Sequence, residues 1–199
     1  MGRPRKHRES AAAALLDAAE RIVEDGGIDA LTVRRVAEAV GTTTRAVYTG
    51  YGSKDALVVA LGTRAFELLR TRLEALPATA DPVADLVTAG VVVFRRFAVE
   101  HPALFAIGIE RRLPEPTLAA GFREPALEAL GGLRALVQRV DAAGLLGGRS
   151  VWDAVRAFHA LCEGLAAMEL RSLFPTGDEE RIWTDALGAL VRGFAAPSG

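Results

Sequence analysis

Apolar residues recur every three or four positions along most of the chain, which is the spacing of an amphipathic α-helix. Alternation of apolar and polar residues, the pattern of a half-buried strand, does not persist for more than a few positions. Glycine, proline and capping residues interrupt the apolar spacing and set the helix ends. The pattern therefore predicts an all-α protein with helices at about 9–25, 32–40, 44–51, 53–76, 81–100, 102–110, 117–142, 150–173 and 178–194.

Two short helices, 32–40 and 44–51, are joined by a turn that contains glycine. This arrangement is typical of the helix-turn-helix, in which the N-terminal residues of the second helix enter the major groove of DNA. A helix N-terminus presents unpaired backbone N–H groups and a partial positive charge, which suit a phosphate or a base acceptor. We expect Thr43 to cap the second helix, and Thr42 and Thr44 to offer hydroxyls to phosphates or base edges. The alternative is that these threonines serve only as caps.

Arg45 has a planar guanidinium group, which can hydrogen-bond guanine through two N–H groups. Tyr48 lies about one turn later, on the helical face that Thr44 and Arg45 share. Thr32 and Lys54 flank the two helices and are predicted to contact phosphates. Such contacts fix the register on DNA, while the first residues of the second helix select the bases.

Two further residues near the end of the second helix have polar groups. Thr49 is a candidate DNA contact, with simple solvent exposure as the alternative. Tyr51 is expected to belong to the core, where its aromatic ring would pack between the helix-turn-helix domain and the helix 53–76.

Residues 32–58 have the sequence TVRRVAEAVGTTTRAVYTGYGSKDALV. The residues of this stretch that allow a comparison with a known family are Thr32, Ala37, Val40, Gly41, Tyr48, Tyr51 and Lys54. In these positions the stretch resembles the DNA-binding head of the TetR family of transcriptional regulators, over about residues 12–61. It departs from the family at Gly50, where histidine is common, and at Arg45, where a small residue is frequent. The resemblance implies an N-terminal DNA-binding domain and a C-terminal helical domain that binds a ligand and dimerises.

The N-terminal sequence GRPRKHR is basic. Residues 1–8 hold a charge of +4, whereas the whole chain has a formal net charge of −1. Basic arms can lie in the minor groove, whose negative potential attracts arginine. Arg3 and Arg5 are therefore candidate DNA contacts in an arm that is expected to be disordered until DNA binds. The alternative is a solvated tail with no role in binding.

Aromatic residues cluster in the region after residue 81, where they could line an apolar cavity for a small molecule. The alternative is a filled core. The resemblance favours the cavity, because TetR regulators commonly bind an inducer in this domain. His159 and Glu163, four residues apart, could hold a ligand or pair with each other, and pairing is the favoured interpretation. The candidate ligand-binding residues are Phe94, Phe97, Phe105, Trp152, Phe158, His159 and Cys162.

The last two helices are expected to form a homodimer. The helix at 150–173 carries Ala157, Ala160, Gly164 and Ala167, small residues that let a partner helix approach closely. The helix at 178–194 offers an apolar stripe of Trp183, Leu187, Leu190, Val191 and Phe194. Part of each stripe must be core, and a symmetric partner would bury the rest in a four-helix bundle.

Several classes of protein do not fit the sequence. A single cysteine, Cys162, excludes an intramolecular disulfide framework, fits a reducing cytosol and argues against a structural zinc site. No recognisable catalytic or phosphate-binding motif is present, so neither an enzyme nor a cofactor is predicted. The apolar run at 86–99 is interrupted by Arg95 and Arg96 and falls short of the roughly 20 residues of a membrane span.

We therefore predict a cytoplasmic, homodimeric, TetR-type regulator that binds a double-stranded DNA operator. Its DNA-binding domain is expected at residues 1–52 and its ligand-binding and dimerisation domain at 53–199, with the helix 53–76 as connector. The favoured function is a repressor that a small apolar ligand, of unknown identity, releases from a pseudo-palindromic operator. Three alternatives stay open: an activator without inducer-released repression, a ligand-binding or enzymatic helical bundle, and a DNA binder indifferent to sequence.

Overall fold

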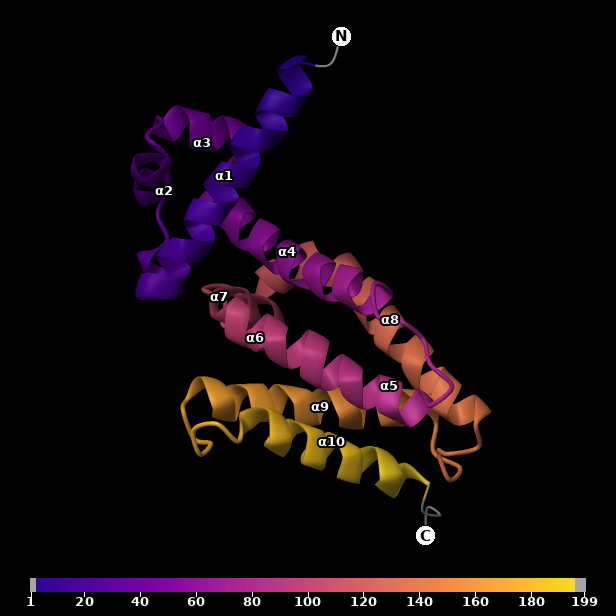
Figure 1. Ribbon diagram of the computed structural model, residues 1–199. Helices are drawn as coiled ribbons and strands as arrows, with labels where there is room; N and C mark the ends of the chain where they lie inside the picture. The colour runs from indigo at the N-terminus through magenta and orange to yellow at the C-terminus, as the bar shows by residue number, and fades with distance from the viewer. Residues whose placement is uncertain (1–2, 196–199) are drawn as a thin grey trace. The chain divides into compact units, whose positions relative to one another are not determined.

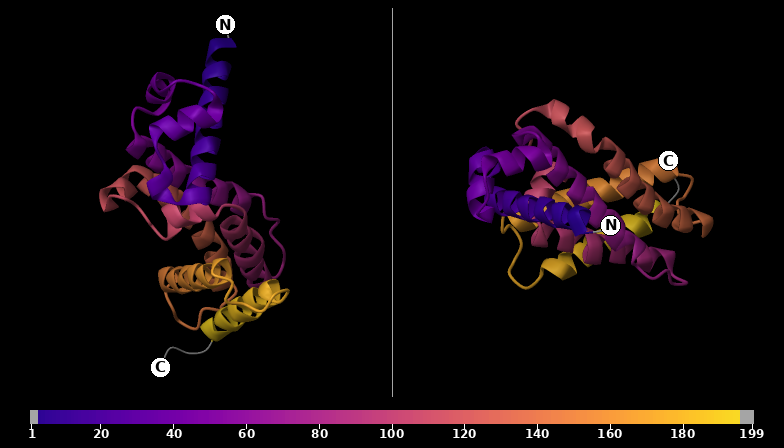
Figure 2. Two further views of the ribbon diagram at one scale, coloured as in Figure 1. Left: turned by 90° about the vertical axis from the view of Figure 1, so that its left-hand side faces the viewer. Right: turned by 90° about the horizontal axis from the view of Figure 1, so that it is seen from above.

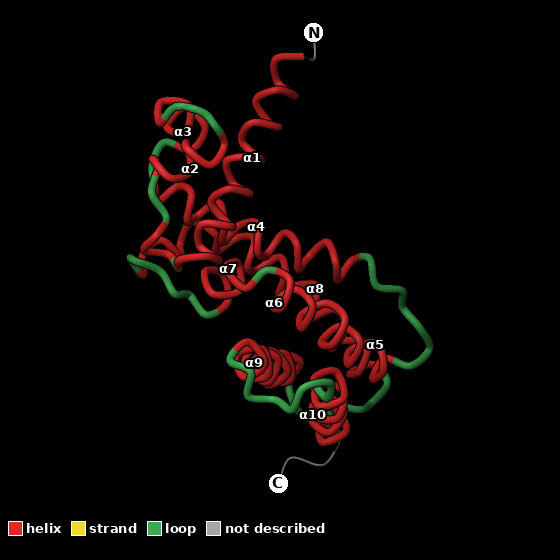
Figure 3. Tube along the Cα trace, turned by 60° about the vertical axis from the view of Figure 1, so that its left-hand side comes forward, coloured by secondary structure: helices red, strands yellow, loops and turns green. Residues whose placement is uncertain are grey.

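The computed structural model describes residues 3–195, with side chains from Ser10 onward. These residues form helices joined by loops and turns, and no strand occurs among them (Figure 3). The all-α class predicted from the apolar spacing is confirmed.

The chain divides into two compact units. The first comprises Met1–Ala65 and Pro102–Pro125, and the second comprises Phe66–His101 and Ala126–Gly199. Helix α4 (Lys54–Glu74) therefore begins in the first unit and ends in the second. The predicted boundary between the DNA-binding and ligand-binding domains, after residue 52, stays a prediction. The compact units are divided later, after Ala65 in the connector helix α4.

Three helices form the head of the first unit. Helices α2 and α3 both pack against α1 and lie on one side of it (Figures 1 and 2). Buried side chains on these helices include Leu15, Val36 and Val47. The bounds are α1 (Arg3–Gly26), the 3-10 turn η1 (Ile28–Ala30), α2 (Val33–Val40) and α3 (Thr44–Tyr51).

Helix α1 begins at Arg3, so the prediction of a disordered arm followed by a helix from Glu9 is wrong for the backbone. Pro4 is compatible with this early start. A proline in the first turn of a helix has no hydrogen-bonded N–H to lose, and its fixed φ suits the helix.

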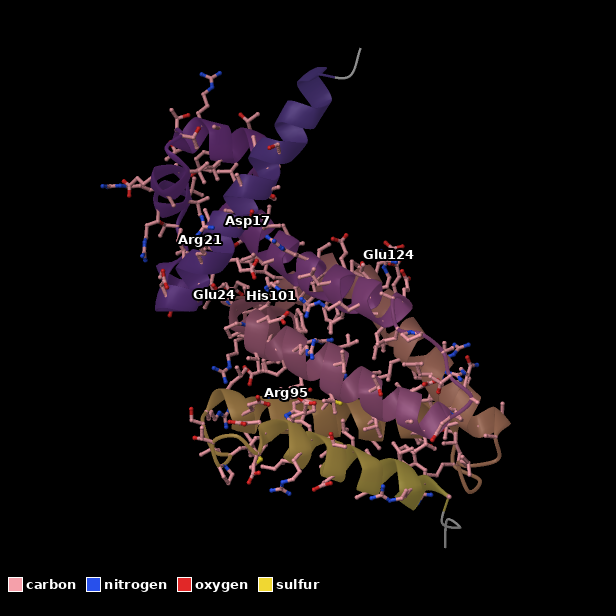
Figure 4. All side chains as sticks on the ribbon, in the orientation of Figure 1. Asp17, Arg21, Glu24, Arg95, His101 and Glu124 are labelled. Atoms are coloured by element: carbon pink, nitrogen blue, oxygen red, sulfur yellow. The ribbon has the colours of Figure 1, made fainter. Side chains whose placement is uncertain are left out.

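The first half of α4 is held against α1 by ion pairs, one of them to Asp17, which is labelled in Figure 4. Arg64 Nη1 lies 2.6 Å from Asp17 Oδ1 and 3.2 Å from Glu20 Oε2. The Glu20 side chain is buried, and the Arg64 side chain is 30% exposed. This charge cluster is less screened than a surface pair and therefore favours one orientation of α4 on α1.

Residues 102–125 complete the first unit. The helix predicted at 102–110 is a short α-helical turn followed by a π-helical segment, and the one predicted at 117–142 begins with a 3-10 turn. The bounds are α7 (Pro102–Leu104), the π-helical η3 (Phe105–Ile109), the 3-10 helix η4 (Pro116–Phe122) and the first residues of α8 (Arg123–Ala142).

In the second unit, α9 and α10 lie side by side (Figure 1). The helix predicted at 81–100 runs through three segments that pack on this pair: α5, the π-helical η2 and α6. A Cβ on Gly90 would lie 2.3 Å from Leu187 Cδ1, so a larger residue in η2 would require the Leu187 side chain of α10 to shift. The bounds are α5 (Pro82–Thr88), η2 (Ala89–Arg95), α6 (Arg96–Glu100), α9 (Val151–Leu170) and α10 (Glu179–Phe194).

A nearly buried charge pair ties η2 to α9 and α10. Arg95, labelled in Figure 4, donates from Nε to both oxygens of Glu169, at 3.1 and 3.0 Å, and its Nη2 lies 2.9 Å from Oε1. The Trp183 indole donates to Glu169 Oε2 at 2.7 Å. The side chains of Arg95 and Glu169 are 18% and 10% exposed, and Trp183 is fully buried. Because all three polar groups have partners, the burial of the charges is compensated.

A second network fixes the loop between α4 and α5. Asp85 accepts hydrogen bonds from the hydroxyl and the backbone N–H of Thr79, and from Arg139 of α8. The Thr79 hydroxyl, the Thr79 N–H and Arg139 lower the pKa of Asp85 from 3.8 to about 2. A lowered carboxyl pKa adds stability above its ordinary value of 3.8, and this stability is lost as the pH falls toward 2.

Candidate nucleic-acid interface

The turn between α2 and α3 is defined by its caps. Thr32 Oγ1 accepts a hydrogen bond from the N–H of Arg35 at 3.2 Å and opens α2. Gly41 ends α2 with a φ of 68°, a left-handed conformation that favours glycine. Thr43 Oγ1 accepts from the N–H of Ala46 at 3.2 Å, so Thr43 is the cap that the sequence predicted.

Helix α3 is anchored on its inner side. Val47 is 1% exposed, and the Tyr51 hydroxyl donates to the carbonyl of Ala12 in α1 at 2.8 Å. Partial burial raises the pKa of Tyr51. Tyr51 is thus half-buried and not part of the fully buried core that was predicted, and its hydrogen bond goes to α1.

The outer side of α3 carries the candidate DNA contacts. Thr42, Thr44, Arg45, Tyr48 and Thr49 are all exposed, Tyr48 by 55%. Among the residues with described side chains, the Arg45 guanidinium has no hydrogen-bond or ion-pair partner. A long cation and a phenol ring therefore project into solvent from one short, anchored helix.

Two of the candidate DNA contacts already form hydrogen bonds within the protein. The Thr49 hydroxyl donates to the carbonyl of Arg45 at 2.9 Å, so in this conformation it remains free only as an acceptor. The Thr32 hydroxyl oxygen accepts its capping bond, which leaves the O–H able to donate to a phosphate. Lys54, half-buried, begins α4 just after Ser53, whose Oγ accepts from the N–H of Ala56 at 3.0 Å. The side chains of Arg3 and Arg5 lie outside the described part of the chain.

The candidate ligand-binding residues do not all lie in one place. Phe97, Phe158 and Cys162 are buried in the second unit, whereas Phe105 is buried in the first. Trp152 is 40% exposed, so its predicted place in an internal cavity is wrong. It lies on the outer side of α9, where the Arg134 guanidinium is 5.6 Å from its ring centroid.

The remaining candidates meet at the junction of η2, α9 and α10. The rings of Phe94 and His159 form an edge-to-face contact with centroids 5.6 Å apart, and Phe94 lies 6.4 Å from Trp183. His159 Nε2 is 3.9 Å from Glu163 Oε2, a distance that suits a loose ion pair and is too long for a hydrogen bond. Burial raises the pKa of the Cys162 thiol, which disfavours the reactive thiolate.

Helices α9 and α10 differ in which of the predicted interface residues are exposed to solvent. On α9, Ala160 and Gly164 are exposed, and Ala157 and Ala167 are half-buried. On α10 the predicted apolar stripe is largely core, since Trp183, Leu187, Val191 and Phe194 are all at most 3% exposed. The exposed small residues of α10 are Ala189 and Gly193.

Among the described residues, no group of three or more His, Cys, Asp or Glu side chains could hold a metal ion. Within the same residues, no helix is both long enough and apolar enough to cross a membrane.

Two family profiles cover most of the chain. The profile of bacterial regulatory proteins of the tetR family matches residues 15–61, which include the helix-turn-helix. The profile of the tetracyclin repressor-like C-terminal domain matches residues 87–190, more than half of the chain. The chain belongs to the TetR family. It is thus a DNA-binding transcriptional regulator with a C-terminal ligand-binding domain, as the sequence predicted.

Solved structures share this TetR fold along most of their length. A Rhodococcus sp. RHA1 protein of unknown function is 24% identical, with a TM-score of 0.80 over 92% of this chain and 95% of the other. The TetR family regulator PfmR from Thermus thermophilus is 21% identical, with a TM-score of 0.70 over 89% and 97%. The regulator FadR from Bacillus subtilis, in complex with stearoyl-CoA, is 17% identical, with a TM-score of 0.77 over 91% and 98%. No curated protein sequence matches the chain significantly.

Proposed function

We propose that this TetR-family chain is a cytoplasmic repressor that binds a pseudo-palindromic DNA operator as a homodimer and leaves it when a small apolar ligand binds. The main support is the outer side of α3, where Thr44, Arg45 and Tyr48 are exposed while Val47 anchors the helix. A recognition helix needs such a division, because a helix that reads bases must be held rigidly by the protein.

Selection of bound duplexes from a random pool tests this proposal. A TetR-type dimer should enrich two inverted half-sites whose centres are one helical turn of DNA, or a multiple of it, apart. Equal recovery of all duplexes would favour a DNA binder indifferent to sequence, and no recovery would favour a bundle that only binds ligand. A reporter gene behind the selected site then distinguishes a repressor from an activator.

Arg45→Ala is expected to relax base choice at one position in each half-site. Loss of a bidentate contact with guanine costs about 1–3 kcal/mol of discrimination. The measurement is a comparison of dissociation constants for the selected duplex and for duplexes with single-base changes. Arg181→Ala, which removes an exposed arginine from α10, is the charge control. If Arg45→Ala weakens every duplex equally, Arg45 contacts phosphate and does not read a base.

Deletion of residues 1–8 should flatten the salt dependence of operator binding. These residues carry +4, and each basic residue that neutralises a phosphate contributes about 0.9 to the slope of log K against log salt. Dissociation constants at four or five salt concentrations, with and without the arm, give the change in slope. An equal slope for both proteins would mean that Arg3 and Arg5 do not bind DNA.

The proposed dimer uses the surface of α9 and α10 that the protomer leaves uncovered. Ala160 and Gly164 are exposed, and a Cβ on Gly164 would meet nothing within 4 Å. Ala189 and Gly193 are the exposed small residues of α10. Small side chains let two helix pairs approach closely, and symmetric pairing would bury both surfaces in one four-helix bundle.

The proposed ligand is a small apolar molecule bound in the second unit. The supporting observation is the pair of half-buried rings of Phe94 and His159, which meet edge to face beside the buried Trp183. Stearoyl-CoA is the first probe to test, because FadR from Bacillus subtilis has the same fold and is in complex with it. A ligand at 100 times its dissociation constant stabilises the folded protein by about 2.7 kcal/mol, which a thermal melt detects. A ligand that raises Tm without releasing the selected duplex would contradict inducer-released repression.

A further inference from the structure

The first unit contains a tight contact between α4 and η4 that depends on glycine. Gly62 of α4 is buried under the ring of Phe122, and a Cβ built on Gly62 would lie 2.3 Å from Cδ1 and 2.8 Å from Cγ of that ring. Phe122 is 1% exposed, so the ring has little freedom to move away. Only glycine at residue 62 permits this approach.

A second contact repeats the arrangement in the opposite direction. A Cβ on Gly121 of η4 would lie 2.6 Å from Cγ1 and 2.8 Å from Cγ2 of Val59 in α4. Each element therefore places a glycine against a side chain of the other, and η4 cannot slide along α4 without breaking one of the two contacts. We call the four residues Val59, Gly62, Gly121 and Phe122 the glycine interlock.

The interlock lies next to the charge cluster that orients α4 on α1. Arg64, two residues after Gly62, pairs with Asp17 and Glu20 of α1. The same stretch of α4 is thus held by α1 through charge and by η4 through packing. Helix α1 in turn packs against α2 and α3, which carry the candidate DNA contacts.

The segment that contains η4 is joined by the chain to the second unit at both of its ends. Residues 102–125 follow α6, which lies in the second unit, and they lead into α8, which begins in the first unit and continues into the second. A change in the second unit that moves the end of α6 or the start of α8 therefore acts on the segment that contains η4. This route is separate from the one that runs along α4 itself.

We infer that the glycine interlock is a positioning element for DNA binding: η4 sets how α4 lies against α1, and thereby how α3 is presented to the operator. This inference rests on the proposed operator binding. None of the four interlock residues needs to touch DNA. Their effect passes through α4, so they are positioning residues and not DNA contacts.

The test compares two clashing variants with their relieved partners. Gly62→Ala and Gly121→Ala should each weaken binding to a duplex selected by the wild-type protein by about 3- to 30-fold, the range of mutations that act through a coupled element. Adding Phe122→Ala to the first variant, or Val59→Ala to the second, removes the atoms that clash and should restore part of the lost affinity. Gly131→Ala in α8, whose Cβ would meet nothing within 4 Å, is the matched control and should bind as the wild type does.

Thermal melts establish that each variant is folded at the assay temperature. Folded clashing variants with wild-type affinity would overturn the inference, and so would a loss that the relieved partners do not restore. If neither clashing variant folds, Val59→Ala alone decides, because it loosens the interlock without a clash, and unchanged affinity would then overturn the inference. Failure of the wild-type protein to select any duplex would instead reject the proposed operator binding.

Discussion

Gly164→Arg is expected to convert the proposed dimer into a folded monomer and to weaken operator binding by about 100- to 10,000-fold. The protomer has room for the new side chain, since a Cβ at Gly164 meets nothing within 4 Å. Arginine also has a higher helix propensity than glycine, so α9 should not unfold. The loss comes from separating two linked DNA-binding heads, each of which then binds one half-site without the high effective concentration that its partner provides.

Gly131→Arg is the matched control for this variant. Gly131 is also an exposed glycine in a long helix with open space around its Cβ, but it lies on α8. Light scattering gives the mass of each variant, and fluorescence anisotropy gives its affinity for the selected duplex. A Gly164→Arg protein that remains dimeric and binds with wild-type affinity would exclude this side of α9 as the dimer interface.

Glu169→Ala should lower the free energy of unfolding by about 3–5 kcal/mol, because it leaves the guanidinium of Arg95 without its nearly buried partner. The Trp183 indole would also lose the acceptor that lies 2.7 Å away. For a chain of this size such a loss lowers Tm by roughly 10 °C. Thermal unfolding followed by circular dichroism measures the effect.

Glu180→Ala provides the comparison within the same charge group. Glu180 Oε2 lies 3.8 Å from Arg95 Nη1, but its side chain is 69% exposed, so its removal should cost no more than about 1 kcal/mol. Equal losses of stability in the two variants would mean that burial of the Arg95–Glu169 pair does not decide its contribution.

The head of the protein could be predicted almost completely from the sequence because its signals are local. Thr43 caps α3, Gly41 ends α2, and Val47 anchors α3 between exposed neighbours, all within about ten residues of chain. The start of α1 was missed, since basic residues and a proline usually indicate a disordered arm. The roles of the individual DNA contacts stay predictions.

The second unit was harder to predict because its main contacts join residues far apart in the chain. Arg95 and Glu169 are 74 positions apart, and no spacing rule links them. One signal was available: Arg95 follows the buried Val91 by four residues, and a charge on the buried side of a helix requires a partner. Trp152 was misplaced because the apolar pattern does not reveal which side of α9 the protomer covers. The π-helical winding of η2 has no periodic signature of its own.

The two tryptophans of this protein differ in solvent exposure, so their intrinsic fluorescence can report on different parts of the second unit. Trp183 is enclosed and hydrogen-bonded to Glu169, so its emission should be blue-shifted and insensitive to iodide. Trp152, partly exposed beneath Arg134, should emit at longer wavelength and be quenched readily. In a Trp183→Phe background, collisional quenching would report the surface of α9 alone, so association of two chains could be followed without any attached dye.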